Sequence, residues 1–302
     1  MENITSQQRH LDMLKTALGQ ALVSFLADDN VIEIMANPDG RVWLDTLDKG
    51  KYLTDIVLPS TQRLNIIKLI ASFNNLLVNE EHPEIACEII FAAARFQGWI
   101  FPVSEEPTFT IRKKARAIHT LDEYIKKGWI STEQTALIKE AIRNKKNILI
   151  AGSTGSGKTT FANAILNELR DSNDRIIVLE DLPELQISSK DHVTLRTNEK
   201  ISMRDLVKGS LRMRPDRIII GEVRDGAALD LLKAWNTGHS GGLCTLHANS
   251  ADSALSRLED LILEVVPQVP QRLIQEAIHL IIFIEKEGSN NFKIAAIKKV
   301  SE

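Results

Sequence analysis

The chain has 302 residues, about twice the length of a typical domain, so we expect two domains. It carries 37 lysines and arginines against 40 aspartates and glutamates, a formal net charge of −3. This balance argues against a protein whose main task is to coat nucleic acid or an anionic membrane, because such binding needs excess positive charge. The 2 cysteines exclude a disulfide framework and a four-cysteine zinc site.

Neither a secretion signal nor a membrane span is expected. The opening residues are polar where a secretory signal needs an unbroken apolar core. The most apolar segment, residues 278–284, is much shorter than the ~20 residues of a membrane helix. We therefore expect a cytosolic protein.

Residues 1–115 are expected to form an α+β domain. Ser60 is predicted to cap the second helix of this domain, because a serine hydroxyl can accept a hydrogen bond from a free amide at a helix start. The predicted elements are a helix that ends near residue 28, strands at 31–35 and 41–45, the helix that follows Pro59, and strands at 85–91 and 108–112.

Two arginines of this domain, Arg95 and Arg112, have two possible interpretations. In the first, they are solvated cations on an edge strand, where charged side chains discourage aggregation. In the second, they are aimed at a phosphate group or at a neighbouring subunit. Residues 116–120 are predicted to be a linker to the second domain, residues 121–302.

The second domain begins with two helix-start signals and a phosphate-binding motif. Thr120 with Glu123, and Ser131 with Gln134, each fit the capping box. A buried strand at 148–151 then leads into a sequence that matches GxxxxGK[ST], the P-loop pattern. The residues of this loop are Gly152, Ser153, Thr154, Gly155, Ser156, Gly157, Lys158, Thr159 and Thr160.

The residue types of the loop suit a nucleoside triphosphate. Glycines let backbone amides surround the phosphates at a helix start, where the helix dipole favours negative charge. Lys158 supplies a positive charge to the β- and γ-phosphates, and the hydroxyl of Thr159 can bind Mg²⁺. The chain has no guanine-reading motif, which favours ATP over GTP.

Acidic residues follow two further strands, at 175–179 and 217–220, whose spacing indicates a parallel sheet. Glu180 and Glu222 therefore face the crevice at the carboxyl ends of the strands, where they can bind Mg²⁺ through water or polarise the attacking water. Glu222 is the better candidate for the base, although either acid alone could be a surface strand cap. Gly221 stands where many P-loop enzymes carry an aspartate, so Glu222 has to serve both metal and water.

A glycine cluster with two histidines, residues 237–249, enters another short strand. We expect this cluster to approach the γ-phosphate, with His247 a better candidate than His239. The alternative is that both histidines are bonded within a loop. A zinc site would need more ligands at suitable spacing.

The order of these motifs resembles that of the secretion-ATPase superfamily. The motifs are the phosphate loop GSTGSGKTT, the acidic strand end VLEDLPEL, the strand RIIIGEVRD and the histidine box TGHSGGLCTLHA. In the first half, EIMANPDGRVWLD and FPVSEEPTFTIRK are similar to the type IV secretion and conjugal transfer ATPases of the TrbB kind. The resemblance therefore covers nearly the whole chain.

This resemblance implies an α/β fold in which a RecA-like P-loop domain follows a smaller, PAS-like α+β domain. It also implies a homohexameric ring with nucleotide at the domain junction. By position, it assigns Lys158 and Thr159 to phosphate and Mg²⁺, Glu180 to the Asp box, Glu222 to the Walker B acid, His247 to the histidine box, and Arg95 and Arg112 to the arginines of the first domain.

We therefore expect a hexameric motor that hydrolyses ATP to power substrate export or pilus assembly in a conjugative type IV secretion system. It would work in the cytoplasm at the inner membrane, beside that system's inner-membrane components, and no specific nucleic-acid binding is predicted. One alternative is a type IV pilus or type II secretion ATPase, although type II relatives usually carry a four-cysteine insertion. Another is an ATP-sensing scaffold that hardly hydrolyses ATP. The net charge disfavours a third, a nucleic-acid motor of the RecA type.

Overall fold

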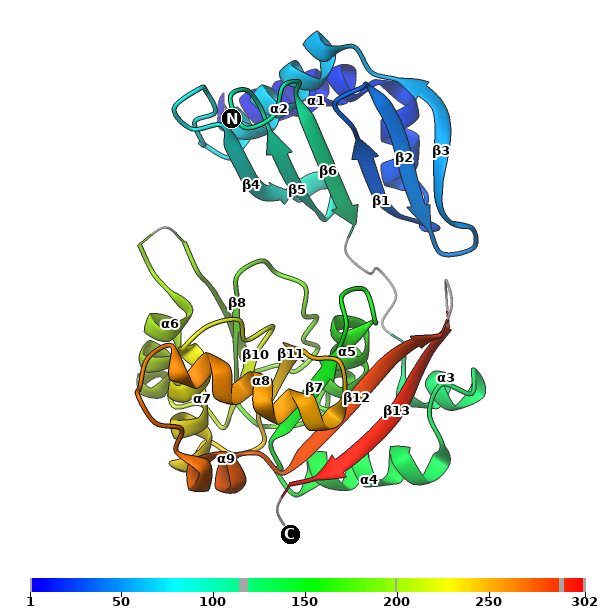
Figure 1. Cartoon of the computed structure of the whole chain (residues 1–302). Helices are drawn as coiled ribbons and strands as arrows, with labels where there is room; N and C mark the ends of the chain where they lie inside the picture. Colours follow the sequence, from blue (N-terminus) through cyan, green and yellow to red (C-terminus); the bar gives the residue numbers. More distant parts are fainter. Residues whose placement is uncertain (1, 114–118, 199, 288–290, 301–302) are drawn as a thin grey trace. The chain divides into compact units, whose positions relative to one another are not determined.

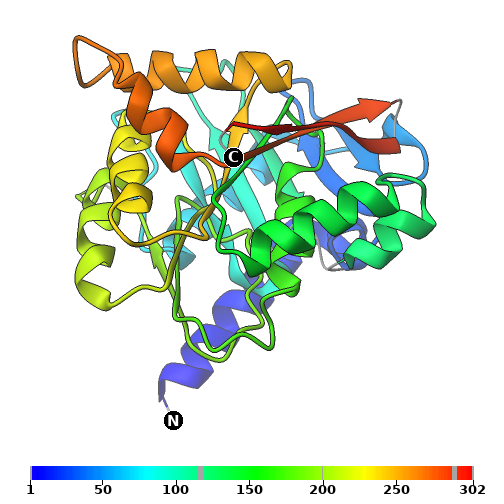
Figure 2. The same cartoon turned by 90° about the horizontal axis from the view of Figure 1, so that it is seen from below.

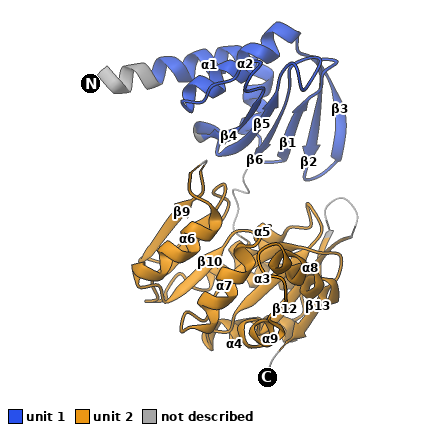
Figure 3. Cartoon of the chain, turned by 60° about the vertical axis from the view of Figure 1, so that its left-hand side comes forward, with its two compact units in different colours: residues 1–116 blue, residues 117–302 orange. Residues whose placement is uncertain are grey.

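A computed structural model describes residues 2–113, 119–198, 200–287 and 291–300. The chain forms two compact units, residues 1–116 and 117–302, coloured separately in Figure 3. Most of the predicted linker lies outside the described residues. Among the described helices, none is both long enough and apolar enough to cross a bilayer.

The first unit is an antiparallel sheet of six strands with two helices on one face (Figure 1). Its strand order is β3-β2-β1-β6-β5-β4. Buried leucines and isoleucines of the two helices pack on the sheet in one apolar core. The elements are α1 (Glu2–Ala27), β1 (Val31–Ala36), β2 (Arg41–Thr46), β3 (Gly50–Val57), α2 (Ser60–Phe73), β4 (Glu84–Ile89), a short 3₁₀ helix (Ile90–Ala92), β5 (Ala94–Trp99) and β6 (Thr108–Lys113).

Two expectations for this unit are wrong. Ser60 does not cap α2, because the preceding Pro59 occupies the cap position and no side chain accepts a hydrogen bond there. The strands that carry Arg95 and Arg112 are not edge strands, because β5 and β6 are neighbours inside the sheet and its edges are β3 and β4. The strands predicted at 31–35 and 41–45 are present as β1 and β2, which form an antiparallel hairpin whose turn depends on Gly40, with a φ of +84°.

The second unit is a seven-stranded sheet in the order β13-β12-β7-β11-β10-β8-β9, and all neighbouring strands are parallel except β12 and β13. The predicted α/β fold with parallel strands is therefore confirmed. The elements are α3 (Leu121–Lys126), α4 (Thr132–Arg143), β7 (Ile148–Gly152), α5 (Lys158–Asn167), β8 (Ile176–Glu180), β9 (His192–Arg196), α6 (Met203–Ser210), a 3₁₀ helix (Leu211–Met213), β10 (Arg217–Ile220), α7 (Ala227–Asn236), β11 (Leu243–His247), α8 (Ala251–Leu263), α9 (Gln271–Ala277), β12 (Leu280–Glu287) and β13 (Asn291–Lys299).

Helices cover both faces of this second sheet. In Figure 2, α7 and α8, in yellow and orange, lie on one side of the sheet, and the green helices of residues 121–167 lie on the other side. Every residue of β7, β8 and β10 is buried, as expected for parallel strands between two helical layers. Both capping boxes predicted for α3 and α4 are present. The apolar layers hold the carboxyl ends of β7, β10 and β11 at one edge of the sheet, where the motifs meet.

Candidate ATP-binding and hydrolysis site

Strand β7 leads directly into a tight glycine loop. The strand ends at Gly152, and α5 begins at Lys158. A methyl group on Gly152 would lie 2.5 Å from both Oγ of Ser156 and the carbonyl oxygen of Ile284. Gly157, the residue before α5, has a φ of +86°, which side chains rarely tolerate. The loop therefore needs glycine at both ends to bring its backbone amides around the start of α5.

The ammonium group of Lys158 lies inside this loop. Its Nζ donates hydrogen bonds to the carbonyl oxygens of Gly152, at 3.0 Å, and Ser153, at 2.8 Å. It also lies 3.1 Å from Nδ1 of His247. Because an ammonium group only donates, Nδ1 of His247 has to be the acceptor, which leaves the ring proton on Nε2. The side chain of Lys158 is thus held at the place where a phosphate chain would enter.

Glu222 follows β10 and lies at the other side of the same histidine. Its Oε1 is 2.9 Å from Nε2 of His247, and its Oε2 accepts a hydrogen bond from Nη2 of Arg224 at 2.6 Å. Burial by itself would raise the pKa of Glu222, but the hydrogen bond and charge of Arg224, together with smaller contributions from His247 and Lys158, hold the pKa below its ordinary value. Glu222 is therefore a carboxylate at neutral pH, and Lys158, His247, Glu222 and Arg224 form a continuous polar chain.

The hydroxyl of Thr159 meets a second carboxylate, that of Glu184. Oγ1 of Thr159 donates to Oε2 of Glu184 at 3.2 Å. Glu184 is held in place by Glu180, a 2 % exposed residue whose Oε1 accepts hydrogen bonds from the backbone amides of Glu184 and Leu185, both at 2.8 Å. The structure thus places Glu180 beneath the turn that presents Glu184 to the loop.

Glu180 also accounts for the glycine at position 221. A methyl group on Gly221 would lie 3.0 Å from Cγ of Glu180. The side chain of Glu180 therefore fills the space into which an aspartate at position 221 would extend. This packing explains why an acid at the end of β8 accompanies a glycine at the end of β10.

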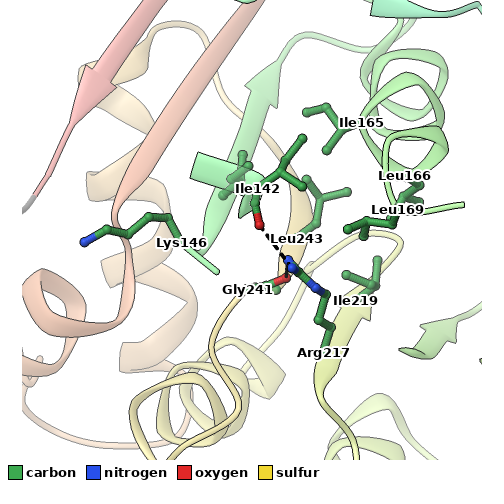
Figure 4. Close-up of a pocket in the computed structure, with 11 residues that line it drawn as sticks. Ile142, Lys146, Ile165, Leu166, Leu169, Arg217, Ile219, Gly241 and Leu243 are labelled. Atoms are coloured by element: carbon green, nitrogen blue, oxygen red, sulfur yellow. Dashed lines mark hydrogen bonds between the residues drawn. The ribbon is translucent and has the colours of Figure 1, made fainter. Parts of the chain in front are cut away.

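Only one end of the segment 237–249 approaches the loop: His247 contacts Lys158, whereas Gly241 and Gly242, which precede β11, do not lie there. Leu243 pairs with Ile148 and His247 pairs with Gly152, which puts Gly241 and Gly242 at the opposite end of these strands from the P-loop. There, Arg217 donates hydrogen bonds to the carbonyl oxygens of Gly241, at 3.1 Å, and Ile142, at 3.0 Å, beside a cavity of about 10 Å³ (Figure 4).

The two histidines of the cluster consequently have different surroundings. His247 is at the carboxyl end of β11, in the polar chain with Lys158 and Glu222. Nδ1 of His239 lies 3.3 Å from the carbonyl oxygen of Ala234, in the last turn of α7. Only His247 of this pair contributes to the site.

Comparison with known proteins identifies the family. Residues 20–290 match the family described as "Type II/IV secretion system protein". The chain belongs to this family. It is 43 % identical over 288 residues to the "Probable conjugal transfer protein TrbB" of Sinorhizobium fredii, an alignment that covers 95 % of this chain and 88 % of the relative. It is 29 % identical over 286 residues to the "Type IV secretion system protein VirB11" of Bartonella henselae, covering 81 % and 80 %.

A solved structure agrees with the fold. The VirB11 ATPase from the Brucella suis type IV secretion system, in complex with sulphate, superposes with a TM-score of 0.53 at 22 % identity and covers 98 % of this chain and 96 % of its own. The predicted membership of the type IV secretion and conjugal transfer ATPases is confirmed, as is the predicted enzyme class. Membership of this family implies ATP binding.

Arg95 and Arg112 lie in the first unit of the secretion ATPase and pair with each other across β5 and β6. Each has an acid as its other cross-strand neighbour, Glu88 for Arg95 and Glu33 for Arg112. Cross-strand partners point to the same face of a sheet, so the four side chains form one row. Burial raises the pKa of Glu33 above its ordinary value, although the charge of Arg112 opposes this. The roles of the two arginines stay predictions.

Two residues of the site were missing from the sequence-based set. Glu184 stands four positions after Glu180, and Arg224 stands two positions after Glu222. The local signal was the presence of further charged residues in VLEDLPEL and RIIIGEVRD. Which of them face the loop depends on the turns after β8 and β10, and those turns are set by tertiary contacts.

Proposed function

We propose that residues 152–160 bind the triphosphate of ATP and that Glu222 orients the water that attacks the γ-phosphate. The observation that carries this proposal is the chain of contacts from Lys158 through His247 to Glu222. Lys158, the cation proposed to bind phosphate, and the ionised Glu222 lie on opposite sides of one imidazole ring. A γ-phosphate that replaces His247 beside Lys158 would lie close to Glu222. General-base and water-orienting roles require this proximity.

The oxygen atoms near Thr159 suit Mg²⁺, which prefers hydroxyl, carboxylate and water ligands. Thr159 Oγ1 and Glu184 Oε2 already lie 3.2 Å apart, and Glu222 is the next carboxylate of the site. Thr159 would bind Mg²⁺ directly, and Glu222 and Glu184 would hold it through water. Bound there, Mg²⁺ would neutralise the charge that develops on the β- and γ-phosphates.

Nucleotide binding would rearrange Lys158. An ammonium group has three donors, and its Nζ now contacts the carbonyl oxygens of Gly152 and Ser153 and Nδ1 of His247. To bind β- and γ-phosphate oxygens, Lys158 has to release some of these partners. When it leaves His247, Nδ1 becomes free to accept a hydrogen bond from another donor, such as the attacking water. Arg224 keeps Glu222 ionised throughout.

At the level of assembly, we propose a homohexamer that works at the cytoplasmic face of the inner membrane with inner-membrane components of a type IV secretion system. Hydrolysis would power substrate export or pilus assembly. Glu180 would act in this motor by positioning Glu184, and Arg95 and Arg112 would supply positive charge from the first unit. Similarity over 95 % of this chain to a conjugal transfer protein supports this assignment.

Steady-state phosphate release and light scattering together test this proposal. Wild type should hydrolyse Mg-ATP and form hexamers, and Glu222→Gln should form the same hexamers without turnover. Glu140→Gln, an exposed change on α4, is the matched control and should behave as wild type. A wild type that binds ATP but releases no phosphate would support the sensing scaffold instead, and a monomer under every condition would contradict the ring.

A further inference from the structure

Aromatic rings gather beside the P-loop, on the face of the sheet that α5 covers. Tyr124 is 5.1 Å from Phe161 of α5 and 5.2 Å from Trp129, measured between ring centroids. Trp129 is in turn 5.8 Å from Phe292 of β13 and 6.0 Å from His119. Tyr124 and Phe161 are buried, whereas Trp129, Phe292 and His119 are only half-buried. The inner rings thus support three outer rings that solvent can reach.

Phe292 contacts the P-loop itself. A methyl group on Gly157 would lie 3.2 Å from Cδ1 and 3.3 Å from Cε1 of this ring. The ring is perpendicular to that of Trp129, with an interplanar angle of 89°. Lys127 Nζ lies 4.3 Å from the centroid of Trp129, so one side of that indole is occupied. Phe292 is therefore the half-exposed ring that lies closest to the phosphate-binding backbone.

The strand order gives the direction of a bound nucleotide. Gly152 lies between His247 of β11 on one side and Ile284 of β12 on the other. The groups proposed to act on the γ-phosphate, Glu222 and His247, follow β10 and end β11. A nucleotide whose γ-phosphate points toward β11 and β10 has to extend its base to the opposite side of β7. In the sheet order, β12 and β13 are the strands on that side.

We infer that the ring of Phe292, supported by Trp129 and His119, is the contact surface for the nucleobase of the bound nucleotide. This inference rests on the proposed phosphate site and adds the part of the nucleotide site that contacts the base. An aromatic face suits any nucleobase, because every base has a π-face, and a purine gains more contact area than a pyrimidine. The ligand class is a purine nucleoside triphosphate, bound with its phosphates at Gly157 and its base against the β12–β13 hairpin.

Binding of two ligands to the full chain tests this inference, namely Mg-ATP and Mg-tripolyphosphate, which has phosphates but no base. Phe292→Leu keeps an apolar side chain on Gly157 and removes the aromatic face. We expect its Kd for Mg-ATP to rise about tenfold, a typical effect of losing one base–aromatic contact, while the Kd for tripolyphosphate stays within about threefold of wild type. Phe292→Tyr restores the ring and should restore ATP affinity.

Phe283→Leu is the matched control, because Phe283 lies in the same hairpin but packs against the core on the opposite face of the sheet. It should leave both affinities unchanged. If Phe292→Leu weakens ATP and tripolyphosphate equally, the ring only supports the loop and the inference is wrong. Unchanged ATP affinity in Phe292→Leu would also show that the inference is wrong. If wild type binds neither ligand, the proposed phosphate site is wrong, and the inference that rests on it is wrong as well.

Discussion

Nε2 of His247 lies 2.9 Å from Oε1 of Glu222. The other nitrogen of the same ring is 3.1 Å from Nζ of Lys158, so one imidazole joins Lys158, which we propose binds phosphate, to Glu222, which we propose orients the attacking water. The contact also separates the two histidines of the TGHSGGLCTLHA segment by function.

Replacing His247 with alanine should lower kcat by at least about tenfold, because Glu222 would then be aligned by Arg224 alone. The KM for ATP should change little, since Lys158 keeps its hydrogen bonds to the carbonyl oxygens of Gly152 and Ser153. His239→Ala is the control and should keep wild-type kinetics. Equal effects of the two substitutions in a phosphate-release assay would argue against the assignment of His247.

Arg224→Gln should shift the acidic limb of the kcat–pH profile to higher pH. Arg224 holds the pKa of Glu222 below its ordinary value, and the carboxylate is the active form. Activity is therefore lost as pH falls through this pKa, and a raised pKa moves that loss to higher pH. Arg272→Gln removes an exposed arginine that pairs with Glu276 on α9, and it should leave the profile unchanged. An unshifted profile in Arg224→Gln would contradict the role of Arg224.

Glu184→Gln should raise the Mg²⁺ concentration that gives half-maximal hydrolysis by about tenfold, the usual effect of losing an outer-shell carboxylate. The substitution keeps a side chain that can still contact Thr159, so the loop should remain intact. Activity measured against Mg²⁺ at saturating ATP checks this. Glu168→Gln, at the far end of α5, should not alter the Mg²⁺ requirement. If the two variants behave alike, Glu184 does not hold the metal.

Asp174→Asn should reduce the free energy of unfolding without changing ATP affinity. Burial alone would raise the pKa of Asp174, but hydrogen bonds from Lys145 and Arg217 lower it from 3.8 to about 2. The shift corresponds to roughly 2 kcal/mol of stability that is present above pH ~4 and is lost as pH falls toward ~2. Urea denaturation at pH 7 should show a loss of this size, and the pH dependence should weaken in the variant. An equally stable variant would contradict this account of the Arg217 network.

The sequence predicted those parts of the molecule that depend on local chemistry. The capping boxes at Thr120 and Ser131 form because a side chain and an amide three residues away are neighbours in any helix start. The strand, glycine loop and helix around Lys158 were also predictable, because they depend on residues that are close together in the sequence. Ser60 failed as a cap because the helix already begins at that residue, with Pro59 before it.

The wrong expectations concern relationships between distant segments. Whether β5 and β6 are edge strands depends on β1 and β4, which no local pattern specifies. Which end of the segment 237–249 lies near the P-loop depends on the direction and register of β11 beside β7, which no local pattern specifies. His247 lies beside Gly152, whereas Gly241 and Gly242 precede the pairing of Leu243 with Ile148. Phe292 contacts Gly157 only because β12 returns beside β7 and β13 pairs back along it.

Isothermal titration of Mg-ATP into the full chain and into Lys158→Ala tests most directly the proposed contact between the P-loop and the phosphates of ATP. The account predicts one binding event per chain in wild type and a Kd at least about tenfold higher in the variant, because a charged hydrogen-bond donor to phosphate is lost. Folded wild-type protein that gives no heat of binding, or a variant with undiminished affinity, would contradict it.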